Sequence, residues 1–186
     1  MNFNRIVCFD LEMCCWNDGR ESRTGEIIEI GVAELDLSSG EIVRRAQHFV
    51  LPEHDEISPF CTELTGIKPE VVAKNGKPLA TILKSVEQKF GGRHKIYAAW
   101  GRDDLILRQE CEEKGLNVPF HEYINLATMF RLQRHVTNRR CGQRAAMKMA
   151  GLEWEGRQHS GYDDAYNLAR LARTMFLPEQ NPSANK

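Results

Sequence analysis

The chain has 186 residues, of which 41% are hydrophobic and 27% charged, and these fractions exclude a disordered, collagen-like or disulfide-stapled small protein. Its 25 basic and 26 acidic residues give a net charge of −1, so the overall charge does not by itself indicate a nucleic-acid partner. The length favours one domain, and no apolar run approaches the ~20 residues that span a bilayer.

The N-terminal sequence and the cysteines bear on the compartment. Residues 1–15 lack a basic segment followed by a long apolar stretch, because Asp10 and Glu12 interrupt it. The six cysteines form no CxxC pair, which favours reduced thiols that act as small core residues. We therefore expect a cytoplasmic protein without a membrane partner, and the sequence does not indicate its oligomeric state.

Strand patterns dominate the first third of the chain. Residues 5–13 predict a central strand, and the polar residues 17–25 predict a loop. Residues 26–36 alternate as a second strand, and residues 41–51 return as a third after the turn at 38–40. Short connections between sequential strands favour an antiparallel meander.

The remainder of the chain alternates between helical and strand patterns. Helices are expected after Pro52 and in particular over 79–90, 104–114 and 143–150, with a strand at 95–100 and a strand running into a helix over 124–130. A last helix ends near residue 176, and Ser160 with Asp163 forms a capping box at its start. This order predicts an α/β domain over residues 1–176 with a mixed sheet, followed by a flexible tail over 177–186.

Asp10 and Glu12 are the first candidates for chemistry. Residues two apart on a strand point to the same face, and two carboxylates at the end of a buried strand are costly unless a cation lies between them. Magnesium or manganese suits such oxygen ligands. The alternative interpretation is that Glu12 has already left the strand and both carboxylates are solvated.

Two further polar segments lie at predicted helix starts. His159 precedes Asp163 and Asp164 at the start of the last helix, where a histidine can serve as a general base across a cleft from a carboxylate. Asp103 and Asp104 begin another helix after Trp100. Acidic residues at such positions commonly only cap a helix and complement its dipole.

Five motifs in order resemble those of the DEDDh 3′–5′ exonucleases, closest to the subgroup of histone-mRNA 3′-end exonucleases and bacterial KapD-like proteins. They are DLEMCCW (10–16), EIIEIG (26–31), LTGI (64–67), WGRDD (100–104) and HSGYDDAYN (159–167). The resemblance implies a ribonuclease-H-like fold with a five-stranded mixed sheet, three antiparallel strands followed by parallel ones. It also implies hydrolysis of single-stranded RNA or DNA from the 3′ end to nucleoside 5′-monophosphates.

The resemblance also implies roles for individual residues. The ligands of two Mg²⁺ or Mn²⁺ ions would be Asp10, Glu12, Asp104 and Asp164, and the general base would be His159. Asp104 is preferred to Asp103 because it keeps the WGxxD spacing. The predicted substrate-binding residues are Met13, Cys14, Trp16, Trp100, Arg139 and Arg140.

The sequence departs from the family at three places. Cys14 replaces a threonine, Asp103 replaces an aromatic residue, and Asn125 replaces an aspartate. Cys14 lacks the hydroxyl that would contact the terminal sugar. Trp16 fits either a stacking platform for a base or a core residue.

Residues 123–152 contain no Asp or Glu but include Arg139 and Arg140 among several cations. This stretch fits either a track for the phosphate backbone or a solvated basic surface. Two other functions remain open from the sequence, a non-catalytic nucleic-acid-binding module on the same fold and a DNA proofreading or repair exonuclease. All four acidic ligands and the histidine are present, which favours an enzyme.

Overall fold

The computed structural model describes residues 3–19, 23–137 and 141–177. Its strands are β1 (Arg5–Met13), β2 (Ile27–Asp36), β3 (Ile42–Phe49), β4 (Ile96–Ala99) and β5 (Glu122–Asn125). Its helices are α1 (Pro59–Thr65), α2 (Pro69–Asn75), α3 (Leu79–Phe90), the 3₁₀ turn η1 (Gly92–His94), α4 (Asp103–Glu113), α5 (Leu126–Gln133), α6 (Gln143–Met149) and α7 (Gly161–Phe176).

The five strands form one mixed sheet in the order β3-β2-β1-β4-β5. β1 pairs antiparallel with β2, which pairs antiparallel with β3, while β4 lies parallel to both β1 and β5. The predicted α/β class and mixed sheet are therefore confirmed. Because β1, β4 and β5 are parallel, their carboxyl ends meet at one edge of the sheet, where loops can bring polar side chains together.

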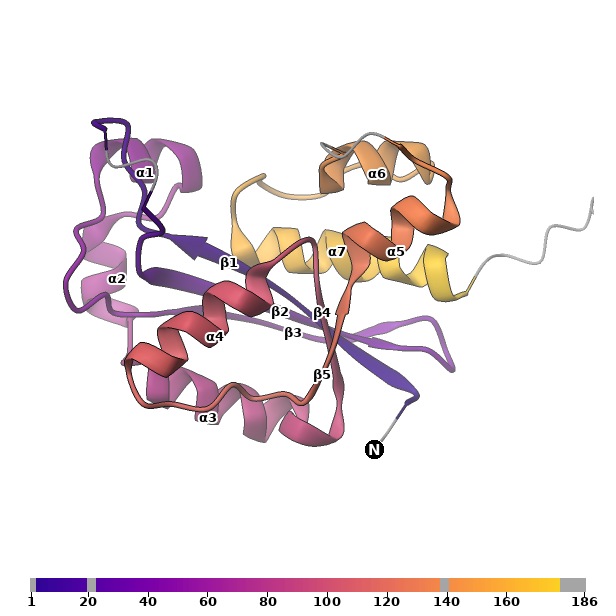
Figure 1. The fold of residues 1–186 in the computed structure, drawn as a ribbon, viewed down its shortest axis with the longest axis horizontal. Coiled ribbons are helices and arrows are strands. Elements are labelled where there is room, and N and C mark those ends of the chain that lie inside the picture. The colour runs from indigo at the N-terminus through magenta and orange to yellow at the C-terminus, as the bar shows by residue number, and fades with distance from the viewer. Residues whose placement is uncertain (1–2, 20–22, 138–140, 178–186) are drawn as a thin grey trace, which may run out of the picture.

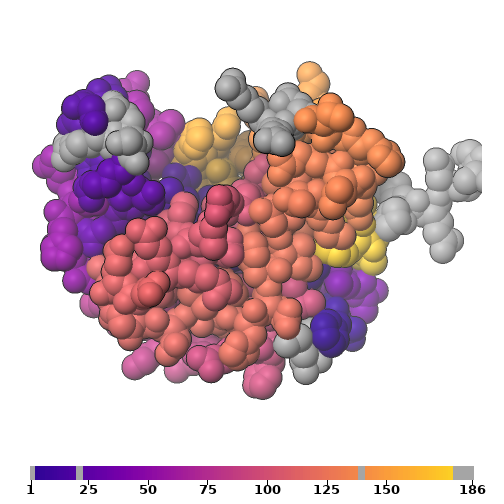
Figure 2. Space-filling model, in the orientation of Figure 1, coloured from indigo at the N-terminus to yellow at the C-terminus, as the bar shows by residue number. Residues whose placement is uncertain are grey.

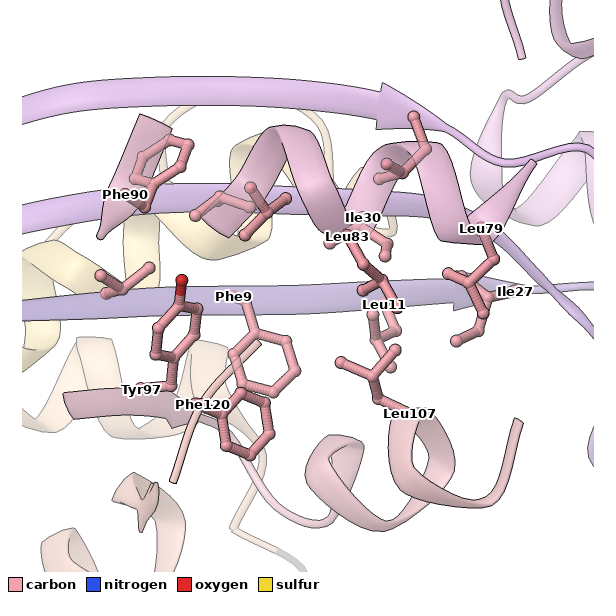
Figure 3. Close-up of a cluster of buried hydrophobic side chains, with 14 of the residues drawn as sticks. Phe9, Leu11, Ile27, Ile30, Leu79, Leu83, Phe90, Tyr97, Leu107 and Phe120 are labelled. Atoms are coloured by element: carbon pink, nitrogen blue, oxygen red, sulfur yellow. The ribbon is translucent and has the colours of Figure 1, made fainter. Parts of the chain in front are cut away.

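Helices cover both faces of the sheet, which produces three layers (Figure 1). On one face, α3 and α4 enclose a core that includes Phe9, Leu11 and Leu107 (Figure 3). On the other face, α5, α6 and α7 pack on a second core that includes Cys8 and Leu168. Successive residues of β1 thus face opposite cores, as the period of a strand requires.

A third, smaller cluster lies beside the end of β1 under α1 and α2 and includes Cys14, Trp16 and Cys61. The two short helices occupy the segment after Pro52, in agreement with the helical structure expected there. None of the helices in the described part of the chain is long and apolar enough to cross a membrane. Of the predicted tail, only residue 177 falls within the described residues.

One local prediction is wrong. The Ser160 side chain makes no capping hydrogen bond at the start of α7, and Asp163 instead accepts from the Arg157 N–H at 2.9 Å and from the Arg45 guanidinium at 3.4 Å. The predicted capping box is therefore absent, and the first N–H groups of α7 are satisfied by a residue from another element, which is described below.

Candidate active site

β1 directs Asp10 and Glu12 toward α7. Both belong to the set of alternate residues that also includes the buried Cys8, and this face of the sheet is the one that α7 covers. Glu12 is 9% exposed, so its carboxylate lies largely out of solvent. The first interpretation of these two residues, that of paired carboxylates at the end of a buried strand, is the one the structure favours.

The start of α7 supplies the groups that face β1. One ligand atom each from Glu12, His159 and Asp164 lies within 4.8 Å of the other two. The His159 N–H donates to Asp164 Oδ2 at 3.2 Å, and His159 adopts a left-handed backbone with φ 61°. A non-glycine residue held in that region is strained, and such strain concentrates at functional sites.

The carboxylates affect one another's ionisation. Burial, followed by the charges of Asp164, Glu29 and Asp103, raises the pKa of Glu12 to about 8. Burial likewise raises the pKa of Asp164 to about 7, with the Asp163 and Glu29 charges acting in the same direction. For Asp10, burial comes first and the charge of Asp103 next in raising the pKa well above its ordinary value. A bound cation would relieve this repulsion.

Asp164 also has an oxygen that suits a cation. The residue is 8% exposed, and its Oδ1 atom is buried without a hydrogen-bond partner among the described residues. A buried carboxylate oxygen without a donor is costly, and carboxylate oxygens are the ligands that Mg²⁺ and Mn²⁺ prefer. The donor set of Asp10, Glu12 and Asp164 therefore fits a hard divalent ion.

α4 brings Asp103 to this cluster, whereas the sequence-based choice is Asp104. Asp103 shares one face of α4 with the buried residues Leu107 and Cys111, at intervals of four residues. Its pKa is raised to about 7, chiefly by burial. Asp104 lies one position further around the helix, where its Oδ2 atom is 3.9 Å from Arg108 Nε. Asp103 is thus the member of the pair whose charge raises the pKa values of Asp10 and Glu12, and the choice of Asp104 as the metal ligand remains a prediction.

The structure also brings in a carboxylate whose role the sequence reasoning missed. Glu29 of the EIIEIG motif is fully buried, with 0% exposure, and lies opposite Glu12 in the β1–β2 ladder. It accepts from the backbone N–H groups of Gly161 at 3.1 Å and Tyr162 at 3.0 Å, and from Gln47 Nε2 at 2.8 Å. Glu29 is therefore the residue that satisfies the first N–H groups of α7.

The residues predicted to contact the nucleotide differ in how deeply they are buried. Met13 is half-buried at the end of β1, and Trp100 is half-buried with its ring 5.9 Å from that of Phe130. Trp16 is 3% exposed beneath the Arg23 guanidinium, which favours a core role over a stacking platform. Cys14 is buried and its N–H donates to Glu26 O at 2.9 Å, so the structure does not favour the predicted contact with a nucleotide.

Asn125 has a structural role at its position in the family pattern. Its Oδ1 atom accepts from the Thr128 N–H at 3.0 Å, which caps α5, and its Nδ2 donates to Gly101 O at 2.5 Å. An aspartate could make the first contact but not the second, because an ionised carboxylate has no donor. Asn125 thus links the end of β5 to the loop that leads into Asp103.

The basic stretch lies partly beside the site. α6 contacts α7 through Gln143 Nε2, which donates to Asp164 O at 2.8 Å, and Arg144 donates to Gln158 at 3.2 Å next to His159. Figure 2 presents a hollow between the indigo and purple N-terminal residues and the orange residues of α5 and α6, with yellow residues of α7 at its floor. Arg139 and Arg140 lie outside the described residues.

Comparison with known proteins agrees with this geometry. The model of the exonuclease family RNase_T matches residues 7–172. ERI1 exoribonuclease 2 of Xenopus laevis is 35% identical over 200 residues, which cover 94% of this chain, and the chain spans 28% of that relative's length. The nuclease domain of 3′hExo, a DEDDh family member solved with rAMP, superposes with a TM-score of 0.82 at 26% identity over 92% of this chain and 91% of that one.

A second solved structure, of a 3′-exonuclease that recognises the 3′ end of a histone mRNA stem-loop, has a TM-score of 0.83 at 27% identity. The superposition covers 93% of this chain and 63% of that one. These likenesses confirm the predicted resemblance to DEDDh nucleases and the predicted α/β fold with a five-stranded mixed sheet.

Proposed function

Because this chain belongs to the RNase_T exonuclease family and its DEDDh group, we propose that it is a metal-dependent 3′–5′ exonuclease that releases nucleoside 5′-monophosphates. The observation that carries this proposal is the convergence of buried carboxylates from β1, α4 and α7, one of which, Asp164, has a buried Oδ1 atom without a hydrogen-bond partner among the described residues. A non-catalytic module would have no need to keep these repelling charges together in a buried place.

In this proposal the ions are Mg²⁺ or Mn²⁺, and the residues that hold them are Asp10, Glu12, Asp103 and Asp164. When bound, two such ions stabilise the charge that develops on the attacking and leaving oxygens of a phosphodiester. The assignment of Asp103 in place of Asp104 rests on the pKa values of Asp10 and Glu12, both of which the Asp103 charge raises.

His159 is proposed as the general base. A ring nitrogen lies within 4.8 Å of carboxylate oxygens of Glu12 and Asp164, and the backbone N–H of His159 donates to Asp164 Oδ2. A ring nitrogen held there can take the proton of the attacking water, a contribution typically worth about 10²–10⁴-fold in rate. The left-handed backbone at φ 61° sets the direction in which the His159 side chain leaves the main chain.

The substrate is proposed to be a single-stranded 3′ end of RNA. Relatives named exoribonucleases and a neighbour solved with rAMP support RNA over DNA. Upstream phosphates would lie along the acid-free basic stretch, of which Arg144 on α6 is next to the site. Arginine contacts to phosphate need no particular base, so they suit a nuclease that removes successive nucleotides.

The test is a degradation assay on matched RNA and DNA strands of one sequence, labelled at either the 3′ or the 5′ end. With Mg²⁺ or Mn²⁺ the 3′ label should be released at once as a mononucleotide, while the 5′-labelled strand shortens stepwise. Asp10→Asn, assayed at the same protein concentration, is the control for contaminating nuclease. Release of the 5′ label first, or equal activity of Asp10→Asn, would refute the proposed function, and faster loss of DNA would refute the RNA preference.

A further inference from the structure

Glu29 lies among the catalytic groups without being one of the proposed metal ligands. Both of its carboxylate oxygens accept N–H groups: Oε1 accepts from Gln47 Nε2 and from the Tyr162 N–H, and Oε2 accepts from the Gly161 N–H. The residue is 0% exposed, so it interacts with protein groups rather than with solvent. Burial raises the pKa of Glu29 above its ordinary value, and the three N–H donors act against this by stabilising the ionised carboxylate.

The start of α7 depends on this carboxylate. The first four N–H groups of a helix have no acceptor within the helix, and a residue at the N-cap commonly supplies one. Ser160 at the N-cap of α7 makes no such side-chain bond. Glu29 supplies the acceptor for Gly161 and Tyr162 from β2, and its negative charge complements the positive end of the helix dipole.

The start of α7 is also positioned by a close backbone contact with β2. Gly31 lies opposite Asp10 in the β1–β2 ladder, and a Cβ atom added to Gly31 would be 1.8 Å from Gly161 O. No side chain larger than hydrogen fits there unless α7 moves away from the sheet. The sequence Glu29-Ile30-Gly31 therefore provides both an anchor and the space for the helix start to dock.

The segment so anchored carries two of the proposed catalytic groups. His159 lies two residues before Gly161, and Asp164 is in the first turn, where its N–H donates to Ser160 O at 2.8 Å. Their distance to Glu12 on β1 is set by where this turn docks on β2, since β2 is hydrogen-bonded to β1 in register. A misplacement of about 1 Å at a reacting centre can cost about 10²-fold in rate.

We propose that Glu29 is a positioning residue, whose carboxylate ties the first turn of α7 to β2 and thereby holds His159 and Asp164 against Glu12. This inference rests on the proposed exonuclease function. It assigns to the EIIEIG motif a role in aligning the two halves of the site, which come from opposite ends of the chain. Glu29 itself contacts neither substrate nor metal in this proposal.

The main test compares Glu29→Gln with Glu34→Gln in the full chain. Glu34 is a matched control because it is also a buried carboxylate of β2, held by Lys95 Nζ at 3.0 Å, and lies five residues further along the strand. Glutamine at position 29 keeps one acceptor oxygen but presents an amide donor to an N–H group, so one bond to α7 is lost. Both variants lose a buried charge, and only one of them loses the anchor.

At saturating Mg²⁺ and RNA, Glu29→Gln should lower kcat by about 10²-fold with KM changed less than about threefold, while Glu34→Gln should leave kcat within about twofold. A second control, Gln47→Met, removes one bond to Glu29 but neither bond to α7, and should also keep kcat close to that of the wild type. Unfolding temperatures of all variants, measured by circular dichroism, separate a loss of stability from a loss of alignment.

Amide hydrogen exchange by NMR supplies a readout that does not depend on activity. In the wild type the Gly161 and Tyr162 amides should be protected, although amides in the first turn of a helix usually exchange rapidly. Glu29→Gln should lose this protection at Gly161 or Tyr162 while later amides of α7 stay protected.

Rapid exchange of both amides in the wild type would overturn the proposal even if Glu29→Gln does not fold. Equal kcat for a folded Glu29→Gln and the wild type would also overturn it. An inactive wild type would instead refute the exonuclease function, and the exchange data would still report whether the anchor exists.

Discussion

Without metal, the carboxylate cluster should make the protein less stable as the pH rises, and Asp164 allows the effect to be worked out. Its pKa is raised from 3.8 to about 7, chiefly by burial. Below pH 3.8 the carboxyl is protonated in both the folded and the unfolded chain, so the raised pKa has no cost. As the pH rises toward 7, the unfolded chain releases this proton and the folded chain retains it, so the free energy of unfolding falls.

The size of this loss in unfolding free energy follows from the difference between the pKa values of Asp164 in the unfolded and folded chain. Each pH unit between the unfolded and folded pKa values costs about 1.4 kcal/mol, so a change from about pH 5 to about pH 7 costs about 3 kcal/mol through Asp164 alone. For a chain of this size that is an unfolding temperature lower by about 5–10 °C. Glu12, with a pKa raised to about 8, acts in the same direction up to that pH.

The assay is thermal unfolding of chelator-treated protein at pH 5, 6, 7 and 8, followed by circular dichroism. Asp164→Asn is the control, because it keeps the side-chain shape but has no proton to lose in this range. Its unfolding temperature should fall less than that of the wild type between pH 5 and pH 7. Saturating Mg²⁺ should raise the unfolding temperature of the wild type at pH 8, since a ligand that binds the folded state stabilises it. Parallel pH curves for the wild type and Asp164→Asn would refute the reasoning.

Three further predictions concern individual residues. Asp103→Asn should reduce the rate far more than Asp104→Asn in the same exonuclease assay, and the reverse order would restore the choice made from the sequence. His159→Ala should lower kcat by about 10²–10⁴-fold, while RNA binding measured by fluorescence anisotropy is largely kept. If binding is lost and the bound complex reacts at an unchanged rate, His159 is a substrate-binding residue. Charge reversal at Arg139 and Arg140 should raise KM for long strands but not for dinucleotides. The slope of log affinity against log salt concentration should become shallower by roughly 0.7 for each phosphate that is no longer neutralised. An unchanged slope would identify the stretch as a solvated surface.

The fold was predictable because the main signals are local. The alternation of apolar residues in β1 and β2 and the helical period of α3 fix which faces are buried, and the bounds of these elements agree with those expected within one or two residues. The short turn between β2 and β3 and the succession of three strands without an intervening helix indicate an antiparallel meander. Parallel pairing of β4 beside β1 follows from the alternation of helix and strand in the second half.

A motif predicts the chemistry of the candidate site, whereas the choice between two neighbouring residues depends on packing. Asp103 and Asp104 are chemically identical neighbours, and the WGxxD spacing favours Asp104. The helical period places Asp103 on the side of Leu107 and Cys111, which face the core, so the spacing and the packing point to different residues. In a comparable way, Trp16 comes shortly after the strand that carries Asp10 and Glu12, yet it is buried in a separate cluster beneath α1 and α2.

The capping of α7 could not be predicted locally because its partner lies far away in the sequence. Ser160 and Asp163 have the spacing of a capping box, but capping boxes describe only residues within a few positions of each other. Glu29 is 132 residues from Gly161 in the sequence. The two residues meet only because α7 packs on the sheet in which β2 pairs with β1. No local pattern carries that information, although a glutamate between two buried isoleucines, Ile28 and Ile30, is a signal that a buried partner exists.

The repulsion within the site explains why its anchors are so extensive. Carboxylates from β1, α4 and α7 raise one another's pKa values, so without a cation their charges favour separation of α7 from the sheet. Glu29 opposes this from β2. Arg157 opposes it from the other side, because its guanidinium donates to Glu63 O at 3.0 Å on α1, its N–H donates to Asp163, and its charge lowers the pKa of Glu12. The loop that carries His159 is thus held between a strand and a helix, so the geometry that the proposed metal ions require is present without them.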